Sequence, residues 1–119
     1  MLATVDAVMS CAFAWGGCDC VGAASAVFAA LHGRDPLEGV SAWRGPAEAM
    51  RIIKAGGGLE RLATAQARRL GLREGHAIGG LAVSVDARTL LVCIQPGIWA
   101  GKTKTGFAIM RQAGRGWYA

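Results

Sequence analysis

Lysine and arginine are absent from the first 33 positions of this 119-residue chain. Their absence removes the basic n-region of a secretory signal. Long apolar runs are also missing, because Gly16, Gly17 and Asp19 interrupt the N-terminal stretch before it reaches the roughly 20 residues of a membrane span. No sequence repeat is present, and a hydrophobic fraction of 53% excludes a disordered chain. We expect a single domain over residues 1–119, made in the cytoplasm without an export signal or a transmembrane segment.

Aromatic residues are scarce as well, with four Trp, three Phe and one Tyr. The net charge of +5 comes from one region that contains only two acids, Glu48 and Glu60. Its basic residues are Arg44, Arg51, Lys54, Arg61, Arg68, Arg69 and Arg73. Such a region is either a solvated helix surface or a surface for nucleic acid or an acidic protein. No aromatic side chain is interleaved for base stacking, so we do not expect nucleic acid as the main partner.

Helical patterns occupy the first part of the chain. Asp19 is a favourable N-cap, Gly33 is a C-terminal stop, and Pro46 suits the first position of a helix. The expected helices cover residues 2–14, 19–31, 46–55 and 59–70.

Strand patterns follow after Gly71. The expected strands cover residues 78–85, 89–95, 97–100, 105–110 and 116–118. Residues 86–88 form the turn of a hairpin, and Lys102 lies in a solvated turn over residues 101–104. Helices followed by an antiparallel sheet indicate an α+β fold.

The segment 13–20 is the most informative for chemistry. Cys20 would stand at the start of the second helix, where free backbone amides and the helix dipole favour the nucleophilic thiolate. A small cysteine at a helix start is also common without any reactivity. The residues alone leave both interpretations open.

Residues 15–20, Trp-Gly-Gly-Cys-Asp-Cys, followed by an alanine-rich helix, resemble the nucleophile segment of the NlpC-type, papain-like cell-wall peptidases. They are more similar still to a compact branch found in tail genes of siphophages and gene transfer agents, with the motif Trp-Gly-x-x-Asp-Cys. The resemblance covers residues 13–32 well. It implies a papain-like core, with N-terminal helices packed on a C-terminal antiparallel sheet.

The resemblance assigns the site residues one by one. Cys20 falls on the nucleophile and Asp19 on the acid that precedes it. The family's histidine falls on Leu91, in a position expected to point at Cys20, and the family's Gly-Asp pair reads Gly75-His76 here.

Neither histidine of the chain is well placed to substitute. His32 follows Cys20 on the same expected helix, about 18 Å away along the axis. If the hairpin turns at Ala87, Leu91 faces Val83, and His76 lies roughly 23 Å further along that strand. His76 remains the candidate base if a different register or a loop excursion brings it closer to Cys20.

The four cysteines, Cys11, Cys18, Cys20 and Cys93, leave three interpretations open. They are free thiols in a reduced compartment, or metal ligands, or they include a disulfide from Cys18 or Cys20 to Cys93 across the cleft. Free thiols are the simplest interpretation. We expect no metal and no cofactor.

The resemblance implies a component of a phage or phage-like particle, located in the virion at the tail tip beside the hub and distal tail proteins. Relatives with an intact cysteine–histidine pair cleave peptidoglycan peptides, whereas Leu91 predicts an impaired or inactive copy kept for assembly. Two alternatives remain. One is an active peptidoglycan peptidase that uses Cys20 during genome delivery. The other is a basic adaptor that binds nucleic acid or an acidic protein through residues 44–73. No membrane partner is expected.

Overall fold

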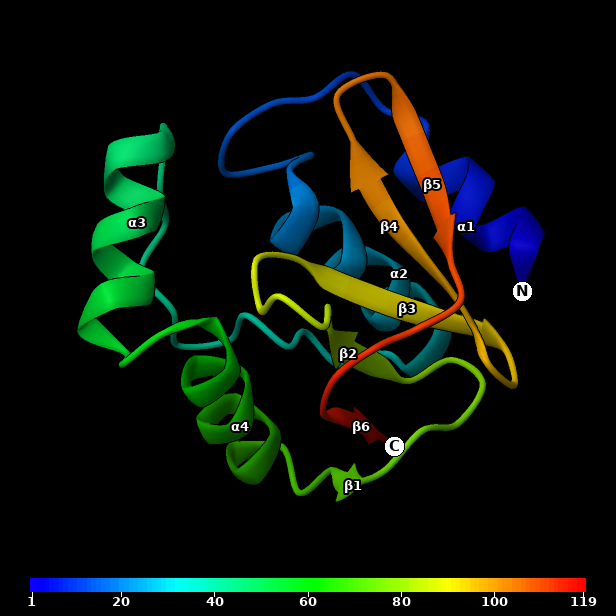
Figure 1. The fold of residues 1–119 in the computed structure, drawn as a ribbon. Helices are drawn as coiled ribbons and strands as arrows, with labels where there is room; N and C mark the ends of the chain where they lie inside the picture. The colour runs from blue at the N-terminus through cyan, green and yellow to red at the C-terminus, as the bar shows by residue number, and fades with distance from the viewer.

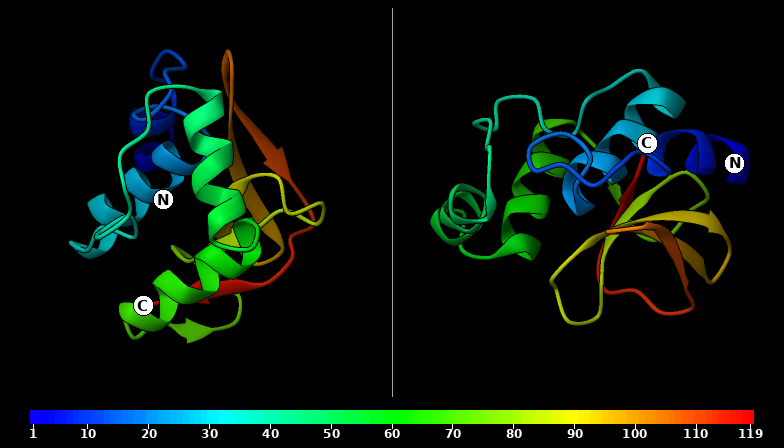
Figure 2. Two further views of the ribbon diagram at one scale, coloured as in Figure 1. Left: turned by 90° about the vertical axis from the view of Figure 1, so that its left-hand side faces the viewer. Right: turned by 90° about the horizontal axis from the view of Figure 1, so that it is seen from above.

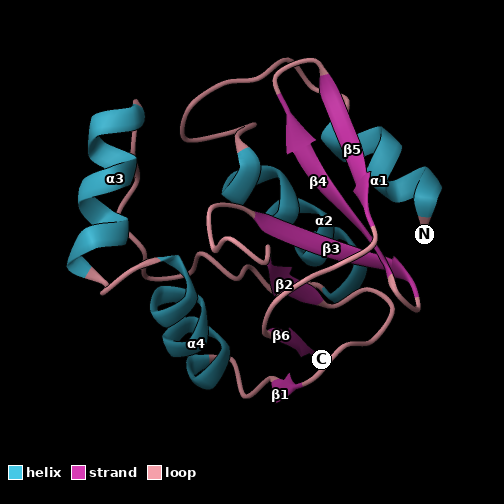
Figure 3. Cartoon of the chain, viewed as in Figure 1, coloured by secondary structure: helices cyan, strands magenta, loops and turns pink.

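The computed structural model describes residues 1–119 and places the helices before an antiparallel sheet, which confirms the α+β class (Figures 1 and 3). The helices are α1 (Leu2–Met9), α2 (Cys20–His32), α3 (Pro46–Ala55) and α4 (Leu59–Arg69). The strands are β1 (Arg73–Glu74), β2 (Leu81–Val83), β3 (Leu90–Gln95), β4 (Ile98–Thr103), β5 (Gly106–Met110) and β6 (Gly116–Tyr118). They form one sheet in the order β1-β6-β2-β3-β4-β5.

Helices α1 and α2 cover one face of the sheet, and α2 lies against β3 and β4 (Figure 2). Helix α4 packs beside β2, whereas α3 stands to one side of this two-layer body (Figure 2). The main core lies between the layers and joins Phe28 and Val27 of α2 to Val92 of β3 and Trp117 of β6. No helix combines the length and the apolar content that a bilayer span requires.

Helix α2 forms as its local sequence predicts. The Asp19 carboxylate accepts a 2.7 Å hydrogen bond from the amide of Gly22, so it caps the first turn. Gly33 ends the helix in the left-handed region, at a φ of 69° that glycine adopts without a Cβ penalty. Ala23 and Ala24 are buried, and their short side chains let the helix approach the sheet closely. The central helix therefore presents its first residue, Cys20, at a defined point.

Helix α1 is shorter than expected, because it ends at Met9 and residues 10–18 form a loop. Within this loop Gly16 has a φ of 84°, and a Cβ at this position would lie 1.9 Å from the carbonyl oxygen of Trp43. Only glycine allows the two backbones to come this close. The loop is thereby held against the 40–45 segment beside the start of α2.

The β2–β3 hairpin turns where expected but in a register shifted by one residue. Leu91 pairs with Ala82 rather than Val83, which pairs with Leu90. The first strand of the hairpin is also shorter than expected. Of residues 78–85, only 81–83 form β2. Since side chains alternate between the two faces of a sheet, such register details decide which face each residue occupies.

Lys102 corrects a second expectation. Strand β4 continues through Thr103, so Lys102 lies within the strand instead of in a solvated turn. Its side chain is only 7% exposed, and its ammonium group donates hydrogen bonds of 2.8 Å to the carbonyl of Met9 and 2.6 Å to that of Cys11. A basic side chain at the end of a helix satisfies carbonyls that have no partner within the helix. Lys102 thus ties the end of α1 to the sheet.

A smaller buried cluster covers the opposite face of the sheet from α2. It consists of Ala82, Leu91, Cys93 and Trp99, with Ala113 packed against them. The segment that joins β5 to β6 crosses this face in front of β3 (Figure 1). Because Leu90 and Val92 belong to the main core with α2, the alternate residues Leu91 and Cys93 point away from that helix.

Candidate functional site

A cleft with a volume of about 210 Å³ opens beside the start of α2. Its walls come from the 15–21 segment, the 37–43 loop, the inner side of α3 and the beginning of α4. Apolar side chains form most of this surface, and the polar groups are contributed by Asp19, Cys20 and Arg88. Concave apolar sites with a few convergent polar groups are typical of ligand binding. This cleft is therefore the candidate site.

Asp19 organises the entrance of the cleft. It is 2% exposed, and it accepts hydrogen bonds from the amide of Gly22 at 2.7 Å, the amide of Gly16 at 3.0 Å and the indole Nε1 of Trp43 at 2.5 Å. Three N–H donors satisfy the buried carboxylate and join the loop, the helix and the 40–45 segment. Asp19 thereby positions the segment that carries Cys20.

Cys20 is the first residue of α2 and has a free, half-buried thiol on the cleft wall. No side chain donates a hydrogen bond to its sulfur or accepts one from it. The residue therefore has the helix-start placement that the sequence predicts, together with access to a cleft. It has no base within hydrogen-bond distance.

Neither imidazole reaches the cleft. Nε2 of His32 lies 2.9 Å from the carbonyl oxygen of Gly79, at the far end of α2. Nε2 of His76 lies 2.8 Å from the carbonyl oxygen of Gly114, and its ring packs edge-on against Trp99 at a centroid distance of 5.0 Å. Trp99 belongs to the cluster on the opposite face of the sheet. The chain thus places no histidine beside Cys20.

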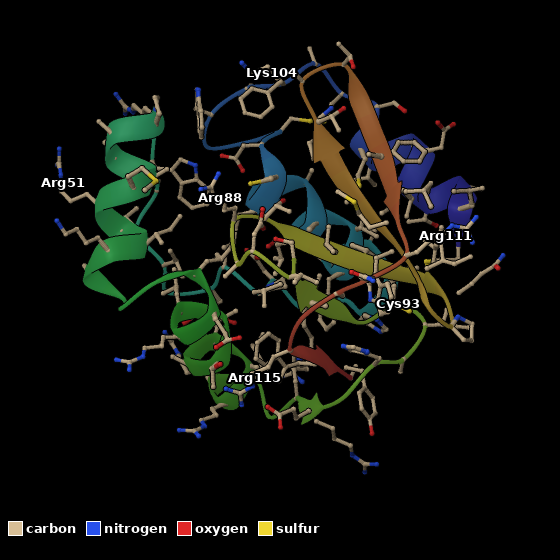
Figure 4. The ribbon with its side chains drawn as sticks, in the orientation of Figure 1. Arg51, Arg88, Cys93, Lys104, Arg111 and Arg115 are labelled. Atoms are coloured by element: carbon tan, nitrogen blue, oxygen red, sulfur yellow. A yellow bond between two sulfur atoms is a disulfide. The ribbon has the colours of Figure 1, made fainter.

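Leu91 does not point at Cys20, which corrects the sequence-based expectation. It is fully buried beside Ala82 and Cys93 on the face away from α2. The hairpin instead extends Arg88 toward the cleft, from the turn that precedes β3 (Figure 4). A histidine at position 91 would accordingly be buried under the 111–115 segment and could not contact the thiol.

The pairing of the cysteines differs from the expected disulfide to Cys93, and two of the four are free thiols. Cys11 and Cys18 form a disulfide that closes the loop carrying Trp15, so they are not free thiols. Cys20 and Cys93 stay reduced, and a bond between them is excluded because they lie on opposite sides of the sheet. Burial raises the pKa of the Cys93 thiol, which donates a 3.1 Å hydrogen bond to the carbonyl of Gln95. No group of three or more His, Cys, Asp or Glu side chains is arranged to hold a metal ion.

Two cleft residues carry no clear signal in the sequence. The pattern indicates only a hairpin turn at Arg88, and nothing separates a core role from an interface role for Trp43. Met50 differs, because helical spacing predicts it on the inward row of residues 46–55 together with Ala47 and Ile53. In the fold Met50 lines the cleft.

The seven basic residues between positions 44 and 73 are all exposed. Arg51 projects from the outer side of α3, away from the rest of the chain (Figure 4). The salt bridge of the chain joins Arg115 to Glu74, so none of the seven has a carboxylate partner. A basic surface without internal ion pairs is free to attract an anionic partner.

Comparison with known proteins identifies the family but no function. No curated protein and no solved structure gives a significant match to the chain. The family model described as a domain of unknown function, DUF6950, matches residues 1–118, and the chain belongs to that family.

Proposed function

We propose that this protein is a structural component of a phage or phage-like tail tip, built on an NlpC-type, papain-like fold that has lost its peptidase chemistry. Support comes from the segment 15–20, which resembles the nucleophile segment of those peptidases and opens the central helix of an α+β fold. The expected neighbours are the hub and distal tail proteins.

One observation carries the loss of chemistry: Cys20 faces a cleft that contains no proton acceptor able to serve it. A cysteine peptidase needs a base to take the thiol proton and an acid to protonate the leaving amine. Both imidazoles bond to backbone carbonyls elsewhere. The Asp19 carboxylate is occupied by three N–H donors, and the guanidinium of Arg88 keeps its protons at any physiological pH. The cleft is suited to binding and unsuited to proton transfer.

The test of inactivity is peptide release from purified peptidoglycan sacculi. We expect no release above background, and the same result for the Cys20→Ala variant. The matched variant replaces only the thiol, so it separates turnover by this protein from a contaminating hydrolase. Turnover that disappears in Cys20→Ala would overturn the proposal and favour the active peptidase.

The tail role is tested by analysing purified phage or phage-like particles for the protein. We expect the protein in purified particles, in a subassembly with the hub and distal tail proteins. A Cys20→Ser substitution should leave particle yield unchanged, because it keeps the size of the side chain. Absence of the protein from purified particles would refute the tail role.

A second candidate function rests on the exposed basic residues of α3 and α4. These unpaired cations favour an adaptor that binds nucleic acid or an acidic protein surface. Binding to duplex DNA that weakens steeply with added salt would support this candidate. Unchanged elution of the protein in the presence of DNA at low salt would exclude the nucleic-acid form of it.

A further inference from the structure

Helix α3 presents an apolar face that the rest of the chain covers only in part. None of its residues is fully buried, although Ile53 packs against the main core, and Ala49 and Ile52 line the cleft with it. Met50 also lines the cleft and is 62% exposed. An amphipathic helix normally gains its stability by burying such a face. Figure 1 shows α3 standing apart from the sheet.

The opposite wall is held in place before any partner binds. Trp15 is 43% exposed on a loop that is closed by the disulfide between Cys11 and Cys18. The bond from the Gly16 amide to Asp19 fixes the same loop to the start of α2. A large aromatic side chain on a restrained loop loses little conformational entropy on binding. Trp15 and Met50 thus form two exposed apolar walls of one cleft.

The charge of the cleft surface is positive. Arg88 is exposed and forms no salt bridge, while the Asp19 carboxylate is buried and satisfied. The nearest other acid along the chain, Asp86, does not line the cleft, and hydrogen bonds from the Ser84 hydroxyl and the Arg88 amide lower the pKa of its carboxyl. On α3 and in the segment before it, the exposed cations Arg44, Arg51 and Lys54 outnumber the exposed acid Glu48. A partner that fills this cleft would therefore gain from carrying a carboxylate.

We infer that the cleft binds a short segment of a partner protein that presents adjacent apolar side chains together with a carboxylate for Arg88. Trp, Met and Arg are the residue types enriched in protein interfaces, and all three are exposed here. An apolar segment lying between Trp15 and α3 would cover the open face of the helix. This inference rests on the assembly role proposed above and names the kind of partner that the role requires.

The experiment uses two peptide libraries of equal length, one of apolar and acidic residues and one of apolar and basic residues. Both are selected on the immobilised full chain at physiological salt. We expect enrichment from the acidic library alone. Met50→Glu should weaken the affinity for the selected peptides by about tenfold, because it places a carboxylate in the apolar wall. Arg88→Glu should also weaken them, whereas the matched charge reversal Arg68→Glu, on α4 outside the cleft lining, should leave binding unchanged.

Cys20 provides a reporter of where the peptide lies. Its thiol is on the cleft wall, Cys93 is buried, and the other two cysteines are paired. A selected peptide should slow the reaction of the Cys20 thiol with Ellman's reagent, and Cys20→Ser identifies the signal. The inference would be overturned if the selected peptides bound the Met50→Glu variant as tightly as the wild type. It would also be overturned if they left the rate of the Cys20 reaction unchanged. Self-association that depends on Met50 would do so as well, because the occupant would then be a second copy.

The two proposals fail separately. If the protein cleaves peptidoglycan sacculi and this activity requires Cys20, the non-catalytic role is refuted. The peptide selection would still report whether acidic, apolar segments bind. A failed selection in a protein without turnover would remove the docking inference alone.

Discussion

The indole nitrogen of Trp43 donates a 2.5 Å hydrogen bond to Asp19, so two residues 24 positions apart share one buried polar network. The same carboxylate caps α2 and fixes the loop at Gly16. The position of Cys20 at the cleft thus depends on the buried carboxylate of the preceding residue.

Replacing Asp19 should be strongly destabilising. Asp19→Ala removes an N-cap and leaves the buried N–H groups without an acceptor, so we expect a loss of about 3 kcal/mol in the free energy of unfolding. Urea denaturation measures the loss. Asp6→Ala is the matched control, because Asp6 is exposed and its carboxylate accepts a hydrogen bond only from the hydroxyl of Ser10. It should change stability by less than about 0.5 kcal/mol. Equal losses in both variants would contradict the network.

Lys102 should stabilise the fold although it resembles a surface residue in sequence. Lys102→Met keeps most of the apolar stem but leaves the carbonyls of Met9 and Cys11 without their donor. We expect a loss of about 2 kcal/mol in the free energy of unfolding. Lys104→Met, two positions further in an exposed turn, should be close to neutral. Similar thermal unfolding of both variants would show that the buried ammonium contributes nothing.

The disulfide predicts the number of free thiols in the chain. Ellman's reagent should titrate two thiols in the unfolded, unreduced chain, namely Cys20 and Cys93. After reduction it should titrate all four cysteines. The double substitution of Cys11 and Cys18 by Ser should cost about 2 kcal/mol, because the closed loop is short. Four titratable thiols without reduction would refute the pairing.

Stability should fall at alkaline pH through Cys93. Its thiol has a raised pKa because it is buried, so the folded chain keeps the proton where the unfolded chain has lost it. The resulting stabilisation is complete below about pH 8.5, the ordinary cysteine value, and is lost as the pH rises beyond it. Cys93→Ala lacks this dependence. The stability difference between the wild type and this variant should therefore shrink from about pH 8 to about pH 10. A constant difference over that range would contradict the assignment.

Local signals were enough for the start and end of α2 and for the start of α3. Asp19, Gly33 and Pro46 act within a few residues of their own positions, by satisfying amides or by presetting backbone angles. Strand register was less predictable. A shift of one residue in the β2–β3 pairing separated the expected partner of Leu91 from the observed one, and the face that Leu91 occupies depends on which layer covers each side of the sheet.

The site shows the same division. The sequence alone determined that a cysteine opens the central helix behind a capping aspartate, because capping and helix initiation depend on neighbouring residues. Tertiary structure decided that Cys11 pairs with Cys18, that both histidines bond elsewhere, and that Arg88 and Met50 share a cleft with Cys20. Those relations depend on how separate elements pack against one another. The separation of two residues along the chain does not determine their distance in the folded structure.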